Sequence, residues 1–186
     1  MTLAAEPHAG PWTEQDLLDL PDNGVRHELL EGALLVNPPP APRHQRVGYL
    51  LTKALDGAVP ADLIVVEAIG VRIPDGSMLI PDVLVVDRDQ GLANRSGIVD
   101  PGLVRLAVEV ASPSSHIMDR LTKPTLYARA GVPHFWRVEI DDAGPAVHSC
   151  LLDRGVYVEW ASSGPGEVFD VDRPFPFQLP VDDLRP

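Results

Sequence analysis

Leu79-Ile80-Pro81-Asp82-Val83-Leu84-Val85-Val86 is an apolar run that carries a single carboxylate. A second run, Leu106-Ala107-Val108-Glu109-Val110-Ala111, has the same character. Apolar runs of this length are typical of strands that are covered on both faces of a sheet. We therefore predict two central strands, over residues 79–86 and 104–111, around which the remaining elements pack.

The rest of the chain adds further strands and a few helices. A capped helix begins at Thr13, because Asp16 follows three residues later as in a capping box. A proline-rich stretch over 37–42 leads into a second helix, whose apolar residues recur at helical spacing. The predicted elements are helices over 12–18, 43–56 and 120–130, a hairpin over 26–36, and strands over 63–69, 134–140, 146–152 and 156–160.

Length and composition place the chain among globular proteins of one domain. It has 186 residues, of which 45% are hydrophobic and 23% charged. Its apolar runs fall far short of the ~20 residues that cross a bilayer, and its first ten residues resemble no signal or transit peptide. Its one cysteine, Cys150, excludes an internal disulfide. We expect a soluble, cytoplasmic α/β protein with no membrane partner. Its single domain would span 1–186, with a core over about 12–160 and a Pro-rich, acidic, irregular tail over 161–186.

The charge balance bears on nucleic acid as a partner. The chain has 27 acidic and 15 basic residues, a formal net charge of -12, whereas non-specific nucleic-acid binders are normally basic. Residues 139–186 hold 10 acidic and 3 basic residues, so most of the excess lies downstream of the candidate site. The net charge therefore argues against DNA without excluding it.

Asp82 and Glu109 interrupt strands in which a core would favour valine. Such a carboxylate must reach the sheet edge, pair with a cation or bind a metal, because an unpaired buried charge is costly. For either residue alone, a strand-end cap or a salt bridge to an arginine is the favoured explanation. Together, on neighbouring strands, the two could share one Mg²⁺, which selects carboxylate oxygens and water. Lys123, one of two lysines beside 13 arginines, is a third candidate, although a surface lysine on a helix would look the same.

An ordered set of short motifs runs from about residue 12 to residue 179. The motifs are His27-Glu28-Leu29-Leu30-Glu31-Gly32, PPAPRHQ over 39–45, Pro81-Asp82-Val83, VEVASPS over 108–114 and DRLTKPTLYARAGVPHFW over 119–136. In this order and spacing they resemble the Uma-two (Uma2) family of restriction-endonuclease-like proteins, within the PD-(D/E)XK nuclease superfamily. The resemblance implies an α/β restriction-endonuclease-like fold, a central mixed β-sheet flanked by helices, with the site at the end of the paired core strands.

The resemblance also implies the chemistry of a Mg²⁺-dependent endodeoxyribonuclease, which hydrolyses DNA phosphodiester bonds. Asp82 and Glu109 match the carboxylates that hold Mg²⁺ or Mn²⁺. Glu28 matches a further catalytic acidic residue, and Lys123 matches a lysine on the following helix. The superfamily pattern places its lysine two residues after the second carboxylate, where this chain has Ala111. The ammonium of the site therefore depends on Lys123.

Arg43 and His44 are the candidate substrate-binding pair. They lie at the start of a predicted helix, where the positive end of the helix dipole and two donors could meet a backbone phosphate. A His44 that faces solvent or bonds locally is the alternative.

Two functions without catalysis stay open. Ala111, and Pro124 directly after Lys123, favour a binding or regulatory protein that keeps the nuclease fold without turnover. The acidic residues of 139–186 favour a protein that engages a basic partner or mimics nucleic acid. A homodimer is also expected, with Trp136 as its candidate contact.

Overall fold

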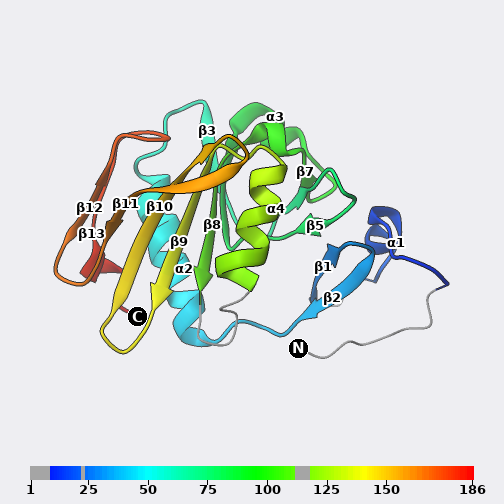
Figure 1. The fold of residues 1–186 in the computed structure, drawn as a ribbon, viewed down its shortest axis with the longest axis horizontal. Helices are drawn as coiled ribbons and strands as arrows, with labels where there is room; N and C mark the ends of the chain where they lie inside the picture. Colours follow the sequence, from blue (N-terminus) through cyan, green and yellow to red (C-terminus); the bar gives the residue numbers. More distant parts are fainter. Residues whose placement is uncertain (1–8, 22–23, 112–117) are drawn as a thin grey trace.

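Two β-sheets make up most of the structure (Figure 1). The computed structural model describes residues 9–21, 24–111 and 118–186. The larger sheet has six strands in the order β11-β10-β9-β8-β6-β3. They are β3 (Leu63–Val66), β6 (Val83–Asp87), β8 (Val104–Ala111), β9 (His134–Ile140), β10 (Pro145–Asp153) and β11 (Val156–Ser163). The sheet is mixed, as predicted, because β8 and β9 are parallel and its other neighbouring pairs are antiparallel.

The smaller sheet has five short strands in the order β2-β1-β5-β4-β7. They are β1 (Arg26–Leu30), β2 (Ala33–Asn37), β4 (Gly70–Arg72), β5 (Met78–Leu79) and β7 (Ile98–Val99). β1 and β2 form the predicted hairpin. Its two turn residues, Glu31 and Gly32, have φ values of 48° and 79°, and positive φ at both positions is the geometry of a tight hairpin turn.

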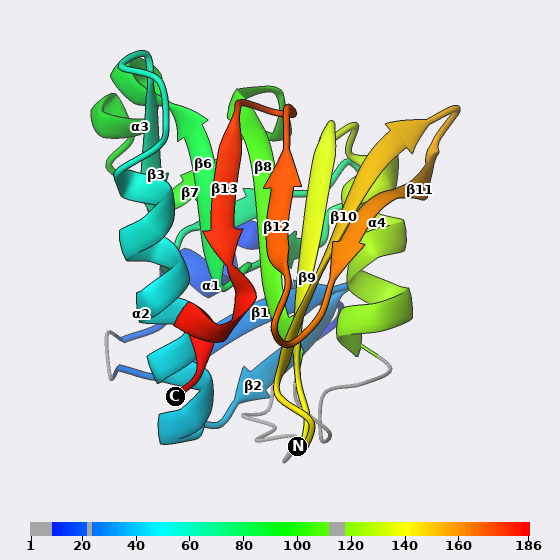
Figure 2. The same ribbon diagram turned by 90° about the vertical axis from the view of Figure 1, so that its left-hand side faces the viewer.

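The helices α2 and α4 cover opposite faces of the larger sheet (Figure 2). The helical elements and the remaining strands are α1 (Glu14–Leu18), α2 (Pro42–Asp56), α3 (Arg88–Ala93), η1 (Pro101–Leu103), η2 (Met118–Thr122), α4 (Lys123–Arg129), β12 (Val168–Val171), β13 (Phe177–Pro180) and η3 (Val181–Leu184). Side chains alternate between the faces of a strand. Val83 and Val85 of β6 accordingly pack with α2, whereas Leu84 and Val86 pack with α4. β6 is thus covered on both faces, as its composition predicted.

The apolar run over 79–86 forms two strands instead of the single strand predicted from it. β5 ends at Leu79 in the smaller sheet, and β6 begins at Val83 in the larger sheet. Pro81 has no N–H to donate to a strand ladder. The N–H of Ile80 donates to the Glu28 carboxylate (2.7 Å) and not to a neighbouring strand. This break places Asp82 where the two sheets meet.

The segment over 161–186 forms a hairpin that joins the core, which corrects the prediction of an irregular tail. β12 and β13 pair in antiparallel fashion and lie on the same face of the larger sheet as α2 (Figure 2). Phe169 and Phe177 pack on Trp136, with ring centroids 5.0 and 5.4 Å from the indole. Burial alternates along β12, so that Phe169 faces the core and Val168 faces solvent.

Trp136 is fully buried beneath this hairpin. A side chain with no exposed surface cannot contact a second copy of the chain, so the proposed role of Trp136 in a homodimer is wrong. The homodimer itself stays a prediction. In the part of the chain that the structure describes, no helix is both long enough and apolar enough to span a membrane.

The hairpin over β12 and β13 should contribute to global stability. We expect Phe169→Ala to lower the free energy of unfolding by about 3–5 kcal/mol, because it removes a fully buried aromatic side chain and leaves a cavity. Urea denaturation followed by tryptophan fluorescence measures the change. Val168→Ala, at an adjacent exposed position, is the matched control and should change stability by at most about 0.5 kcal/mol. A loss below about 1 kcal/mol for Phe169→Ala would show that the hairpin is not part of the core.

Candidate functional site

The buried ammonium of Lys123 joins two carboxylates that belong to different sheets. Its Nζ lies 3.1 Å from Glu28 Oε1 on β1 and 3.1 Å from Glu109 Oε1 on β8. The same nitrogen is 3.3 Å from Glu109 Oε2 and 3.4 Å from the carbonyl oxygen of Ile80. The side chains of Glu28 and Glu109 are 3% and 2% exposed. Lys123 is therefore the cation that makes burial of both carboxylates possible.

Local sequence explains why Lys123 and Glu109 meet. Lys123 is the first residue of α4 and follows the π-helical turn η2, so Pro124 falls in the first turn, where proline is tolerated. Side chains of β8 alternate between the two faces of the sheet. Val108 and Val110 face α2, so Glu109, which lies between them, faces α4. Tyr127 lies four residues after Lys123 on the same face of α4, and its hydroxyl donates to Glu109 Oε1 (2.8 Å).

Glu28 fixes the crossing between the two sheets. One of its oxygens accepts from the N–H of Ile80 (2.7 Å), and the other accepts from the side-chain amide of Asn37 (2.6 Å). Asn37 is the last residue of β2, the partner strand of β1. Glu28 thus has partners on β2, on α4 and in the break between β5 and β6.

Asp82 lies beside this cluster and has three partners of its own. Its Oδ2 accepts from the backbone N–H of Val110 (2.8 Å) and lies 3.2 Å from His44 Nε2 on α2. Its Oδ1 is 3.4 Å from Arg26 Nη1 on β1. The Asp82 side chain is 13% exposed, so this carboxylate is the one that reaches the surface.

Burial and ion pairing shift the pKa values of these groups in different directions. Burial would lower the pKa of the Lys123 ammonium, but the charges of Glu109 and Glu28 outweigh it and raise that pKa above its ordinary value. Burial raises the pKa of Glu109 well above its usual range, and the ammonium of Lys123 offsets this in part. Burial also raises the pKa of Tyr127, so its hydroxyl stays protonated and remains a donor.

The Asp82–His44 pair is shifted in the opposite sense. Burial would raise the pKa of Asp82, but its hydrogen bond to His44 and the charge of that imidazole outweigh burial, and the pKa falls below its ordinary value. Burial would lower the pKa of His44, and the hydrogen bond to Asp82 reverses the sign and raises it. The pair is therefore most stable as carboxylate and imidazolium.

The donor set suits a hard divalent cation in kind. Glu28, Asp82, Glu109 and Asp119 all lie close enough to act electrostatically on Lys123, and all four side chains end in carboxylate oxygens. Mg²⁺ prefers such oxygens and keeps several waters, so one or two carboxylates suffice to hold it. Among the described residues, no three His, Cys, Asp or Glu side chains are grouped so that they could hold one metal ion. A metal here would therefore rest on two carboxylates, with water or substrate oxygens completing its shell.

The structure brings together five of the six residues predicted for the site. Lys123 contacts Glu28 and Glu109, and His44 contacts Asp82. The two groups adjoin, because Asp82 accepts from the N–H of Val110, the residue after Glu109, and is close enough to Lys123 for their charges to interact. Arg43 does not join them, because its guanidinium donates to the carbonyl oxygen of Asp141 in the turn between β9 and β10 (2.8 Å).

Four further residues of the site were missed by sequence reasoning: Arg26, Asn37, Asp119 and Tyr127. Three of them carried a usable signal. Arg26 lies two residues before Glu28 on the same face of β1, and Tyr127 lies one helical turn after Lys123. Asp119 lies four residues before Lys123 and is buried. Asn37 carried no such signal, because it depends on how β2 pairs with β1.

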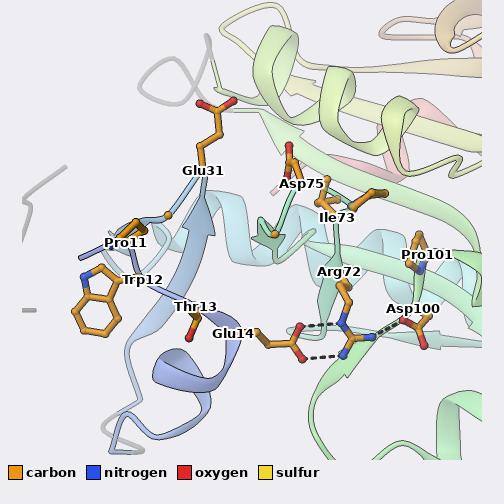
Figure 3. A pocket seen from close by; sticks show the side chains of 13 residues that line it. Pro11, Trp12, Thr13, Glu14, Glu31, Arg72, Ile73, Asp75, Asp100 and Pro101 are labelled. Carbon is orange, nitrogen blue, oxygen red and sulfur yellow. Dashed lines mark hydrogen bonds and ion pairs between the residues drawn. The ribbon is translucent and has the colours of Figure 1, made fainter. Parts of the chain in front are cut away.

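Two cavities open near the smaller sheet, and one of them reaches the site. A cleft of about 430 Å³ is lined by Arg26, Asn37, His44 and Asp82, among others. A larger hollow of about 770 Å³ lies around Trp12 and Arg72 (Figure 3). In that hollow the Arg72 guanidinium is already paired with Glu14 and Asp100. Of the described residues, those that line the larger hollow include none of the six predicted site residues.

The stability that His44 provides should depend on pH. Its pKa is raised on folding, so its contribution is fully present below pH 6.5 and is lost as pH rises through the raised value. The pKa of Asp82 is lowered, so its contribution is lost only in acid. In the presence of EDTA, we expect His44→Gln to cost about 1 kcal/mol more at pH 6 than at pH 9. Urea denaturation at the two pH values measures this difference.

The control is His148→Gln, a histidine on β10 whose partner, Glu159 on β11, is exposed to solvent, so that the change should alter stability by at most about 0.5 kcal/mol at either pH. An equal cost for His44→Gln at pH 6 and pH 9 would contradict the ion pair.

The overall fold is similar to that of a solved nuclease-like protein. The crystal structure of a putative nuclease belonging to DUF820 from Anabaena variabilis superposes with a TM-score of 0.70. The match covers 94% of this chain and 97% of that chain at 16% sequence identity, which supports the fold. No curated protein matches the chain.

A family model gives the remaining comparison. The model of Uma2, described as "Putative restriction endonuclease", matches residues 14–182 and so spans most of the chain. The match includes the contacts described above, from Glu28 on β1 to Tyr127 on α4. The chain therefore belongs to the Uma2 family of restriction-endonuclease-like proteins.

Proposed function

We propose that this protein is a metal-dependent endonuclease that hydrolyses phosphodiester bonds in DNA. The observation that supports the proposal most directly is the contact of Lys123 with both Glu109 and Glu28, beside Asp82. Perturbed ionisable groups that converge next to a cleft are typical of functional sites. The superfamily pattern has its lysine two residues after the second carboxylate, where this chain has Ala111. In this proposal, Lys123 on α4 provides the ammonium in its place.

Four residues of the site have distinct roles in this proposal. Asp82 and Glu109 would hold Mg²⁺ or Mn²⁺. The bound ion would polarise the phosphate and lower the pKa of a water molecule. Lys123 and Tyr127 hold the Glu109 carboxylate in one orientation through donors to both of its oxygens. The Lys123 ammonium would also stabilise the negative charge that develops on the phosphate oxygens in the transition state.

Arg26 and His44 are the cations that would face the phosphate backbone. Both contact Asp82, and both line the cleft that leads to it. Since Arg43 bonds a turn outside that cleft, Arg26 replaces it as the arginine expected to bind substrate at this site. Arg43 is exposed and keeps at most a peripheral role on the nucleic-acid backbone.

The metal site should be measurable without a nucleic-acid substrate. We expect Mn²⁺ to bind the wild-type protein in isothermal titration calorimetry, and Asp82→Asn to abolish binding, because the variant removes one of two metal carboxylates and keeps the shape of the side chain. Asp170→Asn is the control, since Asp170 is an exposed carboxylate on β12 outside the site. If the wild type bound no Mn²⁺ at millimolar concentration, a binding or regulatory protein without turnover would replace the nuclease.

Nuclease activity should depend on one of the two lysines. We expect Lys123→Met to reduce Mn²⁺-dependent nicking of supercoiled DNA at least about 100-fold, because it removes a charge that stabilises the transition state. Lys53→Met removes the other lysine, which is exposed on α2, and should leave the rate unchanged.

The melting temperatures of both variants must be measured alongside this assay to show that they are folded. Loss of Lys123 leaves two buried carboxylates without their cation, which destabilises the fold. Glu109→Gln, which keeps the shape of the side chain but loses the charge and one acceptor oxygen, should also abolish nicking. Equal nicking by the wild type and a folded Lys123→Met variant would exclude the proposed role of the ammonium.

A further inference from the structure

The cleft next to Asp82 has the size of a site for one small unit. Its volume of about 430 Å³ lies in the lower part of the ~300–1,000 Å³ range of pockets that hold a single small molecule. The walls come from β1 with the two residues before it, from the end of β2 with the prolines 38–40, and from the first half of α2. Glu67 and Ala68, which follow β3, also line the cleft, and the Glu67 carboxylate accepts from the Thr52 hydroxyl.

A glycine inside α2 keeps the cleft open. Gly48 is buried near the middle of this helix, where glycine is the least favourable residue after proline. A Cβ added at Gly48 would meet no neighbouring atom within 4 Å, so the position faces empty space and is not forced to glycine by packing. Gly48 lies one turn after His44 on the same face of α2, and both residues line the cleft. Any larger side chain at Gly48 would project into this space.

An exposed aromatic ring borders the same space. Tyr49 lines the cleft, is 56% exposed, and has the guanidinium carbon of Arg46 5.5 Å from its ring centroid. An exposed aromatic ring with an adjacent cation is the usual platform on which a nucleic-acid base stacks. In the same cleft, Arg26 and His44 both contact Asp82 and could bind a phosphate.

We propose that this cleft holds one unstacked nucleotide of a single strand, with its base against Tyr49 and its phosphate near Arg26 and His44. The inference rests on the proposed nuclease function and narrows its substrate to single-stranded, frayed or looped segments of nucleic acid. A paired duplex cannot enter without extruding a nucleotide, which requires unstacking of that base. The net negative charge of the chain is consistent with this mode of binding. Stacking of one base contributes affinity that does not depend on the broad basic surface needed to bind a duplex.

The test compares binding of a labelled single-stranded 12-mer with binding of its blunt duplex, by fluorescence anisotropy in Ca²⁺. We expect the single strand to bind at least 10-fold more tightly. Tyr49→Ala should weaken single-strand binding about 5- to 100-fold, since it removes one stacking platform, whereas Tyr49→Phe should retain it. Trp160→Ala, which removes an exposed aromatic ring on β11 outside the cleft, is the matched control and should have no effect.

Gly48→Gln tests the open space independently of stacking. It should weaken single-strand binding at least 10-fold, while the Mn²⁺ affinity of the carboxylates stays unchanged and thermal stability does not fall, because glutamine is a better helix former than glycine. Gly102→Gln is the control, because Gly102 in η1 also has open space around a Cβ and lies outside the cleft.

The outcomes separate this inference from the proposed function. Duplex binding and cleavage as strong as those of the single strand would overturn the inference and leave the nuclease in place. Unchanged single-strand binding by Gly48→Gln and Tyr49→Ala would do the same. Absence of Mn²⁺ binding, with cleavage of neither substrate, would refute the proposed function. Tight single-strand binding lost in both variants would support the cleft even then.

Discussion

The pairing of Lys123 with Glu28 and Glu109 is the interaction on which the arrangement of the two sheets depends. Removal of one partner from a buried ion pair leaves a charge that neither water nor protein stabilises. Glu28 belongs to the smaller sheet, Glu109 to the larger sheet and Lys123 to α4. The three elements are therefore held in one relative position by a requirement for charge neutrality, in addition to the apolar contacts that each makes separately.

The break at Pro81 provides backbone partners for the buried side chains of this cluster and also positions Asp82. A continuous strand over 79–86 would satisfy its backbone groups through ladder bonds and would leave Glu28 and Lys123 without their contacts to Ile80. Because the strand is interrupted, a backbone N–H and a carbonyl become partners of the buried side chains. The same interruption turns Asp82 toward Val110 and His44, so one proline links the crossing of the sheets to the geometry of the site.

The sequence predicted the parts of the structure that follow from local pattern. Asp82 and Glu109 are predicted because a carboxylate in an apolar strand needs a partner. Lys123 is predicted because lysine is rare beside the 13 arginines, and the resemblance to the family supports it. The sequence pattern does not predict β4, β5 and β7 as strands of their own, since two or three residues are too few to establish a period. The hairpin of β12 and β13 was hidden by the prolines around it.

Other features of the site depend on pairing between distant segments, which one sequence does not encode locally. Arg43 and Arg26 are both arginines near a proposed site, and which of them reaches Asp82 depends on how β1 pairs with β2 and β5. The direction of the pKa shift of Glu109 likewise depends on complete burial, which results from α4 and the two sheets together. Periodicity identified the carboxylates, and tertiary packing determined their partners.

The position of β12 and β13 has a consequence for how the chain folds as it is synthesised. These strands pack on the face of the larger sheet that carries the side chains of Val83, Val85 and Val108. A ribosome makes the chain from its N-terminus, so residues 26–163 emerge before the segment that covers this face. The nascent sheet must keep an apolar surface exposed until residues 168–184 are available, and such surfaces associate readily with one another. Completion of the core should therefore follow release of this segment, and shielding of the sheet by a chaperone would matter most in that interval.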